Sequence, residues 1–213
     1  MKINKKIVVV ILTYNSEQVI KKTIIAAKKI SKDVVILDSF SKDKTIKIAK
    51  KLKCQIFKRK FTNYSDQRNC IIKKCNNLYQ WQLHLDSDEI LSKNLIRNIQ
   101  KILQFNERNF CYLIKRRPFF LGKGLKFGGA SNWHLRLFPS KTTRVENKLY
   151  DQHFISNLKT KYLSGLIYDM NTQNLHQWIN THNKWSDLEA SQKDNITKKD
   201  ILRGNLFGNK IER

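Results

Sequence analysis

The first hundred residues contain short, continuous apolar runs rather than the alternating pattern of half-buried strands. The first run, residues 7–12 (IVVVIL), is rich in β-branched side chains, and a second lies at 34–37 (VVIL). Such runs are typical of strands buried on both faces of a parallel sheet. Two shorter strands are predicted at 55–58 and 81–85.

Between these strands, apolar residues recur at helical spacing. The pattern predicts two helices that begin at the N-cap residues Ser16 and Ser41, and a third helix over 66–75. Strands that alternate with helices of this length imply right-handed crossovers. We therefore predict a doubly wound, mostly parallel α/β sheet of the Rossmann-like type, in which ligands bind at the carboxyl ends of the strands.

The regular alternation stops near residue 106. Beyond it we expect a mixed-strand extension followed by an amphipathic helix, so that residues 1–106 and 107–213 form two halves of a single domain. The elements predicted after the third crossover are a helix over 92–103, strands over 110–117, 134–138 and 163–168, and the amphipathic helix over 172–190.

The chain is strongly basic. It has 42 Lys and Arg against 17 Asp and Glu, which gives a formal charge of +25 over 213 residues. The excess is spread along the chain and is mostly Lys, whereas specific DNA readers rely on Arg for bidentate base contacts. Codon bias and a functional basic surface both explain such an excess. No apolar stretch reaches the length of a membrane-spanning helix.

Polar residues follow three of the predicted strands at the point where each ends. Thr13, Tyr14 and Asn15 follow the first strand, Asp38 follows the second, and the acidic run 86–89 (DSDE) follows the fourth. Because the carboxyl ends of parallel strands meet at one rim of a sheet, we expect these side chains to converge there.

Asp86 and Asp88 are the strongest candidates for metal chemistry. Continued strand alternation past residue 85 would point both carboxylates to the same side, where they repel unless a cation lies near them. Oxygen ligands suit Mg²⁺ or Mn²⁺, which also accept phosphate oxygens. The pattern therefore indicates a divalent ion that holds a diphosphate, and the alternative is a solvated acidic turn capping the next helix.

Four segments follow one another along the first ninety residues: VVVILTYNSE (8–17), VVILDSFSKDKT (34–45), YSDQRN (64–69) and WQLHLDSDEI (81–90). Together, and in this order, they resemble the nucleotide-sugar-binding domain of glycosyltransferase family 2, which has the GT-A fold. Three later segments are WHLRLF (133–138), KLYDQHF (148–154) and HNKWSDLEA (182–190). They resemble the subgroup that contains lipopolysaccharide-core β-glucosyltransferases.

The resemblance implies a role for each rim residue. Asp88 would be the direct metal ligand, and Asp86 would face both the ribose and the metal. Asp38 would accept hydrogen bonds from the uracil or the ribose, and Arg68 would lie near the base or the phosphates. The residues implied to line the nucleotide pocket are Thr13, Tyr14 and Asn15.

An inverting transfer also needs a general base that removes the proton of the acceptor hydroxyl. Family members often place this acid next to a His after the RLF-like strand. Spacing from Phe138 favours Asp151, with Tyr150 in place of the usual His, and Glu146 is the second choice. Arg136 either stabilises the leaving diphosphate or forms a structural ion pair.

The resemblance thus implies an inverting, Mg²⁺- or Mn²⁺-dependent enzyme that moves one hexose from a nucleotide sugar, expected to be UDP-linked, to a glycan or lipid-linked acceptor such as lipopolysaccharide core. We expect a cytoplasmic protein in peripheral contact with the anionic inner membrane, and no nucleic-acid partner. The alternatives are a basic protein that binds nucleic acid or membrane, and an inactive copy truncated at the carboxyl end, where the family usually continues.

Overall fold

The computed structural model describes residues 5–127, 131–147, 152–170 and 174–193. The chain divides into two compact units, residues 1–173 and 174–213. The described part of the second unit is a single helix, α5 (Leu175–Lys193). No helix in the described ranges combines the length and the apolar character that a membrane crossing requires.

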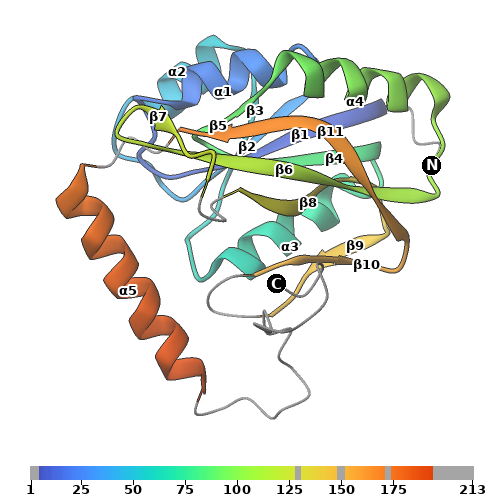
Figure 1. Ribbon diagram of the computed structural model, residues 1–213. Coiled ribbons are helices and arrows are strands. Elements are labelled where there is room, and N and C mark those ends of the chain that lie inside the picture. Colours follow the sequence, from blue (N-terminus) through green and yellow to red (C-terminus); the bar gives the residue numbers. More distant parts are fainter. Residues whose placement is uncertain (1–4, 128–130, 148–151, 171–173, 194–213) are drawn as a thin grey trace, which may run out of the picture. The chain divides into compact units, whose positions relative to one another are not determined.

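The first unit is built on one mixed sheet of nine strands within the described ranges (Figure 1). Its main path runs β3-β2-β1-β4-β8-β6-β11-β5, with β7 paired to β6. Strands β8 and β5 run antiparallel to their neighbours, and the other strands of this path are parallel to one another. Strands from before and after residue 106 belong to this sheet, so the two predicted halves share it.

The first four parallel strands match the predicted ones closely. Their bounds are β1 (Lys5–Thr13), β2 (Val34–Asp38), β3 (Gln55–Lys58) and β4 (Tyr79–Asp86). The remaining strands are β5 (Glu89–Leu91), β6 (Phe110–Phe120), β7 (Lys123–Gly124), β8 (Asn132–Pro139), β9 (Thr143–Val145), β10 (Phe154–Ser156) and β11 (Lys159–Asp169).

Helices cover both faces of this sheet (Figure 1). Side chains of β1 alternate between two apolar clusters: Val9 packs with residues of α1 and α4, while Val8 and Val10 pack with residues of α3. This alternation is why the first apolar run has no polar face. The helices are α1 (Ile20–Ala27), α2 (Thr45–Lys51) and α4 (Lys93–Phe105) on one face, and α3 (Tyr64–Cys75) on the other.

Two predicted helix starts are wrong, and both errors have the same cause. Helices α1 and α2 begin at Ile20 and Thr45, and neither has a side-chain N-cap. The Ser16 hydroxyl donates instead to the backbone oxygen of Tyr14 and lies 2.9 Å from the Ser87 hydroxyl, and the Ser41 hydroxyl donates to Asp38. Both serines therefore stabilise the rim of the sheet, because their hydroxyl groups bond rim residues instead of the first turn of a helix.

Strand alternation also ends earlier than expected. Strand β4 stops at Asp86, and Ser87 and Asp88 form a turn into the short strand β5, which the sequence analysis did not predict. Strand β5 pairs antiparallel with the end of β11, from Glu89↔Asp169 to Leu91↔Ile167. This pairing brings a distant acidic residue, Asp169, next to the acidic turn.

Candidate active site

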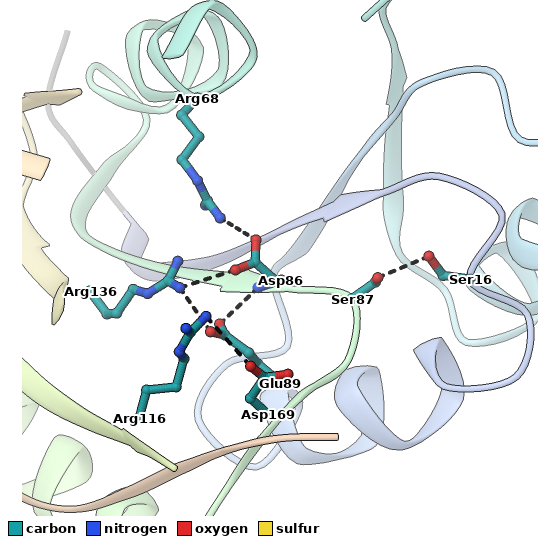
Figure 2. A network of polar contacts seen from close by, with 8 residues as sticks. All are labelled: Ser16, Arg68, Asp86, Ser87, Glu89, Arg116, Arg136 and Asp169. Atoms are coloured by element: carbon teal, nitrogen blue, oxygen red, sulfur yellow. Dashed lines mark hydrogen bonds and ion pairs between the residues drawn. The ribbon is translucent and has the colours of Figure 1, made fainter. Parts of the chain in front are cut away.

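The carboxyl end of β4 carries a cluster of charged side chains (Figure 2). The Asp86 carboxylate accepts hydrogen bonds from two guanidinium groups: Arg68 of α3 bonds one oxygen, and Arg136 of β8 bonds the other at 3.0 Å. Burial alone would raise the pKa of Asp86, but the two arginines hold it below its ordinary value. Asp86 is therefore a fixed anion.

Glu89 and Asp169 extend this cluster. The Glu89 side chain is 1% exposed; it accepts a hydrogen bond from Arg136 at 2.8 Å and one from the Asp86 backbone N–H at 2.9 Å. Arg116 of β6 lies 3.5 Å from the Asp169 carboxylate. Helix α3 of the first half thus supplies one arginine and strands β6 and β8 of the second half supply the other two, and Figure 2 shows the side chains converging on the end of β4.

Asp88 is the acidic residue of this cluster for which no ion pair is found among the described residues. Burial, together with the neighbouring carboxylates of Asp169, Asp86 and Glu89, raises its pKa to about 7. Burial also raises the pKa of Glu89, to about 7, against the opposing effect of Arg136. Four carboxyl groups therefore lie near three guanidinium groups, and among the described residues the Asp88 carboxyl is the one that a guanidinium group does not pair with.

These residues fit a divalent cation that is held mainly by a ligand's phosphates. Within the described ranges, no group of three or more His, Cys, Asp or Glu side chains is arranged to hold a metal ion by itself. Mg²⁺ commonly binds through one or two carboxylates together with phosphate oxygens. Asp88 fits this role better than Asp86, since both oxygens of Asp86 already accept hydrogen bonds from arginines.

The predicted nucleotide-pocket residues lie together at the ends of β1 and β2. Asp38 is fully buried, and its carboxylate accepts hydrogen bonds from the Thr13 hydroxyl at 3.0 Å and from the Ser41 backbone N–H at 2.9 Å. Asn15 has a positive φ of 45°, and its side chain accepts from the backbone N–H of Lys42 at 2.9 Å. Tyr14 is 59% exposed beside this loop.

Two hydroxyl contacts link this pocket to the acidic turn. Ser16 bonds the side chain of Ser87, and the Thr23 hydroxyl of α1 donates to the backbone oxygen of Ser87 at 2.7 Å. The turn between Asp86 and Asp88 is therefore fixed from the side of β1 and α1. We expect this linkage to hold Asp88 at a constant position relative to Tyr14.

Asp151, the first choice for the general base, lies outside the described residues. The second choice, Glu146, is described: its carboxylate accepts hydrogen bonds from the ring Nδ1–H and the backbone N–H of His153, each at 2.8 Å. Its backbone oxygen accepts from the Ser65 hydroxyl of α3 at 2.6 Å. The structure thus holds an acid-histidine pair at Glu146, with the histidine following the acid.

The sequence analysis placed Glu89 at the rim without a role, and it missed two further members of the charged cluster, Arg116 and Asp169. Glu89 follows Asp88 directly in the chain, whereas Arg116 and Asp169 reach the cluster only through the pairing of β6 and β11. A signal was present for Glu89, because an acidic residue directly before the apolar pair Ile90-Leu91 is seldom buried unless it is paired. No local signal marks the other two.

Residues 8–156 match the family model described as glycosyl transferase family 2. The chain belongs to this family. The predicted family, the GT-A fold class and the prediction of a glycosyltransferase are thereby confirmed at the level of the family.

The relatives of this chain include two curated proteins of Rickettsia. The uncharacterized glycosyltransferase RT0209 of Rickettsia typhi is 28% identical over 220 residues, which cover 96% of this chain and 71% of the relative. The uncharacterized glycosyltransferase RP128 of Rickettsia prowazekii is 27% identical over 198 residues, which cover 87% and 67%.

Solved structures of Staphylococcus aureus TarS share the fold. TarS 1–349 in complex with UDP-GlcNAc aligns with a TM-score of 0.54 at 15% identity, over 81% of this chain and 60% of TarS 1–349. Another TarS structure aligns with a TM-score of 0.54 at 16% identity, over 92% and 40%. The chain thus spans about half the length of these structures.

Proposed function

We propose that this chain transfers one hexose from a nucleotide sugar to an acceptor hydroxyl, with inversion and with the help of a divalent cation. The observation that carries the proposal is that the Asp88 carboxyl group, just after β4 in a family 2 domain, lies among other carboxylates and has no guanidinium partner in the described residues. Asp88 would hold Mg²⁺ or Mn²⁺, and the cation would stabilise the negative charge of the departing diphosphate.

UDP is the nucleotide that we propose for the donor. A protein of the same fold, TarS, was solved with UDP-GlcNAc, and the exposed Tyr14 ring lies beside the buried Asp38 at the end of the first two strands. Tyr14 offers a face for the base, and the loop that Asp38 and Asn15 hold in place supports it. Arg68 retains one buried guanidinium nitrogen without a hydrogen-bond partner in the described residues, a donor suited to a phosphate.

The remaining members of the cluster act through these residues. Arg136 bonds both Asp86 and Glu89, so we assign it to positioning the acidic turn, which fits the structural alternative better than direct contact with the leaving group. Asp86 is proposed to face the ribose and the cation from its fixed position between Arg68 and Arg136.

We propose Asp151 as the general base, with Glu146 as the alternative. The pairing of Glu146 with His153 supports the alternative, because the ring holds the carboxylate in one orientation. The variants Asp151→Asn and Glu146→Gln distinguish them. The variant that binds the donor normally but no longer transfers the sugar identifies the base. If both variants retain transfer, the base lies elsewhere.

A glycan or lipid-linked acceptor of the cell envelope, such as lipopolysaccharide core, is the proposed acceptor class. It follows from the resemblance of the three later segments, including WHLRLF, which forms most of β8. The proposed location is the cytoplasm, in peripheral contact with an anionic membrane.

The donor half of this proposal is tested by calorimetric titration of UDP with and without Mn²⁺. We expect Mn²⁺-dependent binding that weakens at least about tenfold in Asp88→Asn, because the cation loses its protein ligand. Asp33→Asn is the matched control, since Asp33 pairs with Lys5 at the opposite end of the strands. Equal UDP affinity in Asp88→Asn and wild type, with Mn²⁺ present, would refute the metal assignment.

A further inference from the structure

Strand β6 continues beyond the charged cluster into a short hairpin, residues 118–127, which we call the tip hairpin. Strand β7 pairs with the end of β6 through Phe119↔Gly124 and Phe120↔Lys123, and the Leu125 backbone N–H donates to the Pro118 carbonyl at 2.9 Å. Figure 1 shows β7 at the end of the sheet opposite to the C-terminal end of α4. The tip hairpin thus projects from the rim that carries the candidate active site.

The tip hairpin exposes large apolar side chains. Leu121 is 64% exposed, Leu125 38% and Phe127 88%. Leu121 occupies the first turn position with a φ of 47°, followed by Gly122 with a φ of 77°. Gly, Asn or Asp is favoured at such a position, so a leucine there costs free energy and gains no burial. An exposed apolar residue kept at this cost points to a surface that covers it.

The charge of this segment is entirely positive. The tip hairpin, residues 118–127, contains two Lys and no Asp or Glu, and these residues, Lys123 and Lys126, are exposed between the apolar side chains. Two copies of this surface would repel each other in a symmetric dimer. Alternating exposed Lys and protruding apolar side chains fit a negatively charged layer with an apolar interior.

The surface next to the tip hairpin has the same character. The Phe119 ring contacts the Tyr168 ring at 5.7 Å between centroids, and Tyr168 lines an open hollow of about 930 Å³. Among the described residues, those that line the hollow include Lys93, Arg97 and Lys115, and none of them is acidic.

Two exposed aromatic residues belong to this adjoining surface. Trp133 is 42% exposed and Tyr162 is 59% exposed, and the centroids of their rings lie 4.7 Å apart. Trp and Tyr are the residues favoured at the level of lipid headgroups.

We propose that the tip hairpin is a membrane-docking surface that inserts Leu121, Leu125 and Phe127 into the headgroup region of an anionic lipid bilayer. Lys123 and Lys126 bind the lipid phosphates, and the basic hollow lies against the bilayer beside them. Docking in this orientation places the rim of the sheet near the membrane. The proposal rests on exposure, strain and charge, and it is independent of the sugar-transfer reaction.

Co-sedimentation with vesicles tests the proposal on the full chain. We expect binding to vesicles of phosphatidylcholine and phosphatidylglycerol, weaker binding at high salt, and little binding to phosphatidylcholine alone. Leu121→Ser combined with Phe127→Ser is expected to lower the partition coefficient about tenfold or more, because the inserted apolar area is lost.

The matched control is Phe105→Ser. Phe105 is 79% exposed at the C-terminal end of α4, far from the tip hairpin, and its replacement is expected to leave vesicle binding unchanged. Circular dichroism and thermal unfolding show whether each variant is folded.

Three results would overturn the proposal. The first is equal vesicle binding by the double variant and the wild type. The second is a loss of vesicle binding in Phe105→Ser as large as that in the double variant. The third is that the wild type does not bind vesicles while light scattering shows a changed oligomeric state in the double variant. The last result would assign the surface to a protein partner.

Discussion

At the scale of single residues, the candidate active site depends on which charges are compensated. Asp86 and Asp88 are two positions apart in the chain, yet Asp86 is bonded by two arginines while Asp88 faces carboxylates. The sequence identified both acids and left two explanations for their proximity, a bound divalent cation or a solvated acidic turn. Arginines from α3 and β8 carry part of the charge compensation, and their positions depend on tertiary structure.

His84 illustrates the same effect for a group that the sequence analysis did not single out. It lies fully buried in β4, 3.0 Å from the Gln82 side chain, and its ring stacks on Phe138. Its Nδ1 has no hydrogen-bond partner in the described residues. Burial, together with Arg68 and Arg136, holds the pKa of His84 well below 6.5.

Because the pKa of His84 is low in the folded protein, we expect the protein to become less stable as the pH falls below about 6.5. The unfolded chain binds a proton below about pH 6.5 while the folded chain does not, so the free energy of unfolding decreases as pH falls. We expect His84 to account for about 2 kcal/mol between pH 7 and pH 5. Urea unfolding of wild type and His84→Phe at both pH values measures this difference.

The exposed His176 provides the control, as His176→Gln. This variant is expected to follow the pH dependence of the wild type. The interpretation of His84 would be refuted by a His84→Phe variant that loses as much stability between pH 7 and pH 5 as the wild type.

At the scale of elements, the order of helices and the strands of the main path, including the antiparallel β8, could be predicted, whereas the short antiparallel strand β5 could not. Continuous apolar runs mark β1, β2 and β4 because both faces of these strands are buried. Strand β5 has three residues, one of them a buried glutamate, and it forms only because β11 lies beside it. Its sequence alone contains no strand pattern.

A glycine fixes how α4 packs on β11. Gly165 has a φ of 116°, and a Cβ atom there would lie 2.6 Å from the backbone N and Cα of Leu95. The register of β11 against β6 shifts at this point, between Leu163 and Leu166. Ser92, the N-cap of α4, donates its backbone N–H to the Leu166 carbonyl at 2.9 Å, which ties the helix start to the strand.

Gly165→Ala is therefore expected to destabilise the protein by about 2–4 kcal/mol, because strain and a clash with helix backbone add together. Gly122→Ala is the control: its φ of 77° is also positive, but no atom lies within 4 Å of the added Cβ. We expect about 1 kcal/mol for the control. Urea unfolding measures both, and equal losses would show that the contact with Leu95 adds nothing.

At the scale of the whole molecule, the charge of +25 has gained a more specific meaning. Most acidic residues that matter to the candidate site are gathered at one end of the sheet, and the tip hairpin beside them is basic and apolar. Composition could indicate an anionic partner, but it could not locate the contact. That location depends on a hairpin whose exposed leucine and phenylalanine resemble ordinary core residues in the sequence.

The pairing of β5 with β11 also determines when this end of the sheet forms during synthesis. Residues 86–91 leave the ribosome long before residues 159–170, yet the Met170 backbone N–H donates to the Asp88 carbonyl and β11 completes the edge. Pairings between distant segments form slowly. A nascent chain that already contains β1 to β4 therefore still lacks the strand that completes the acidic turn, and the charged cluster cannot be complete before β11 has been synthesised.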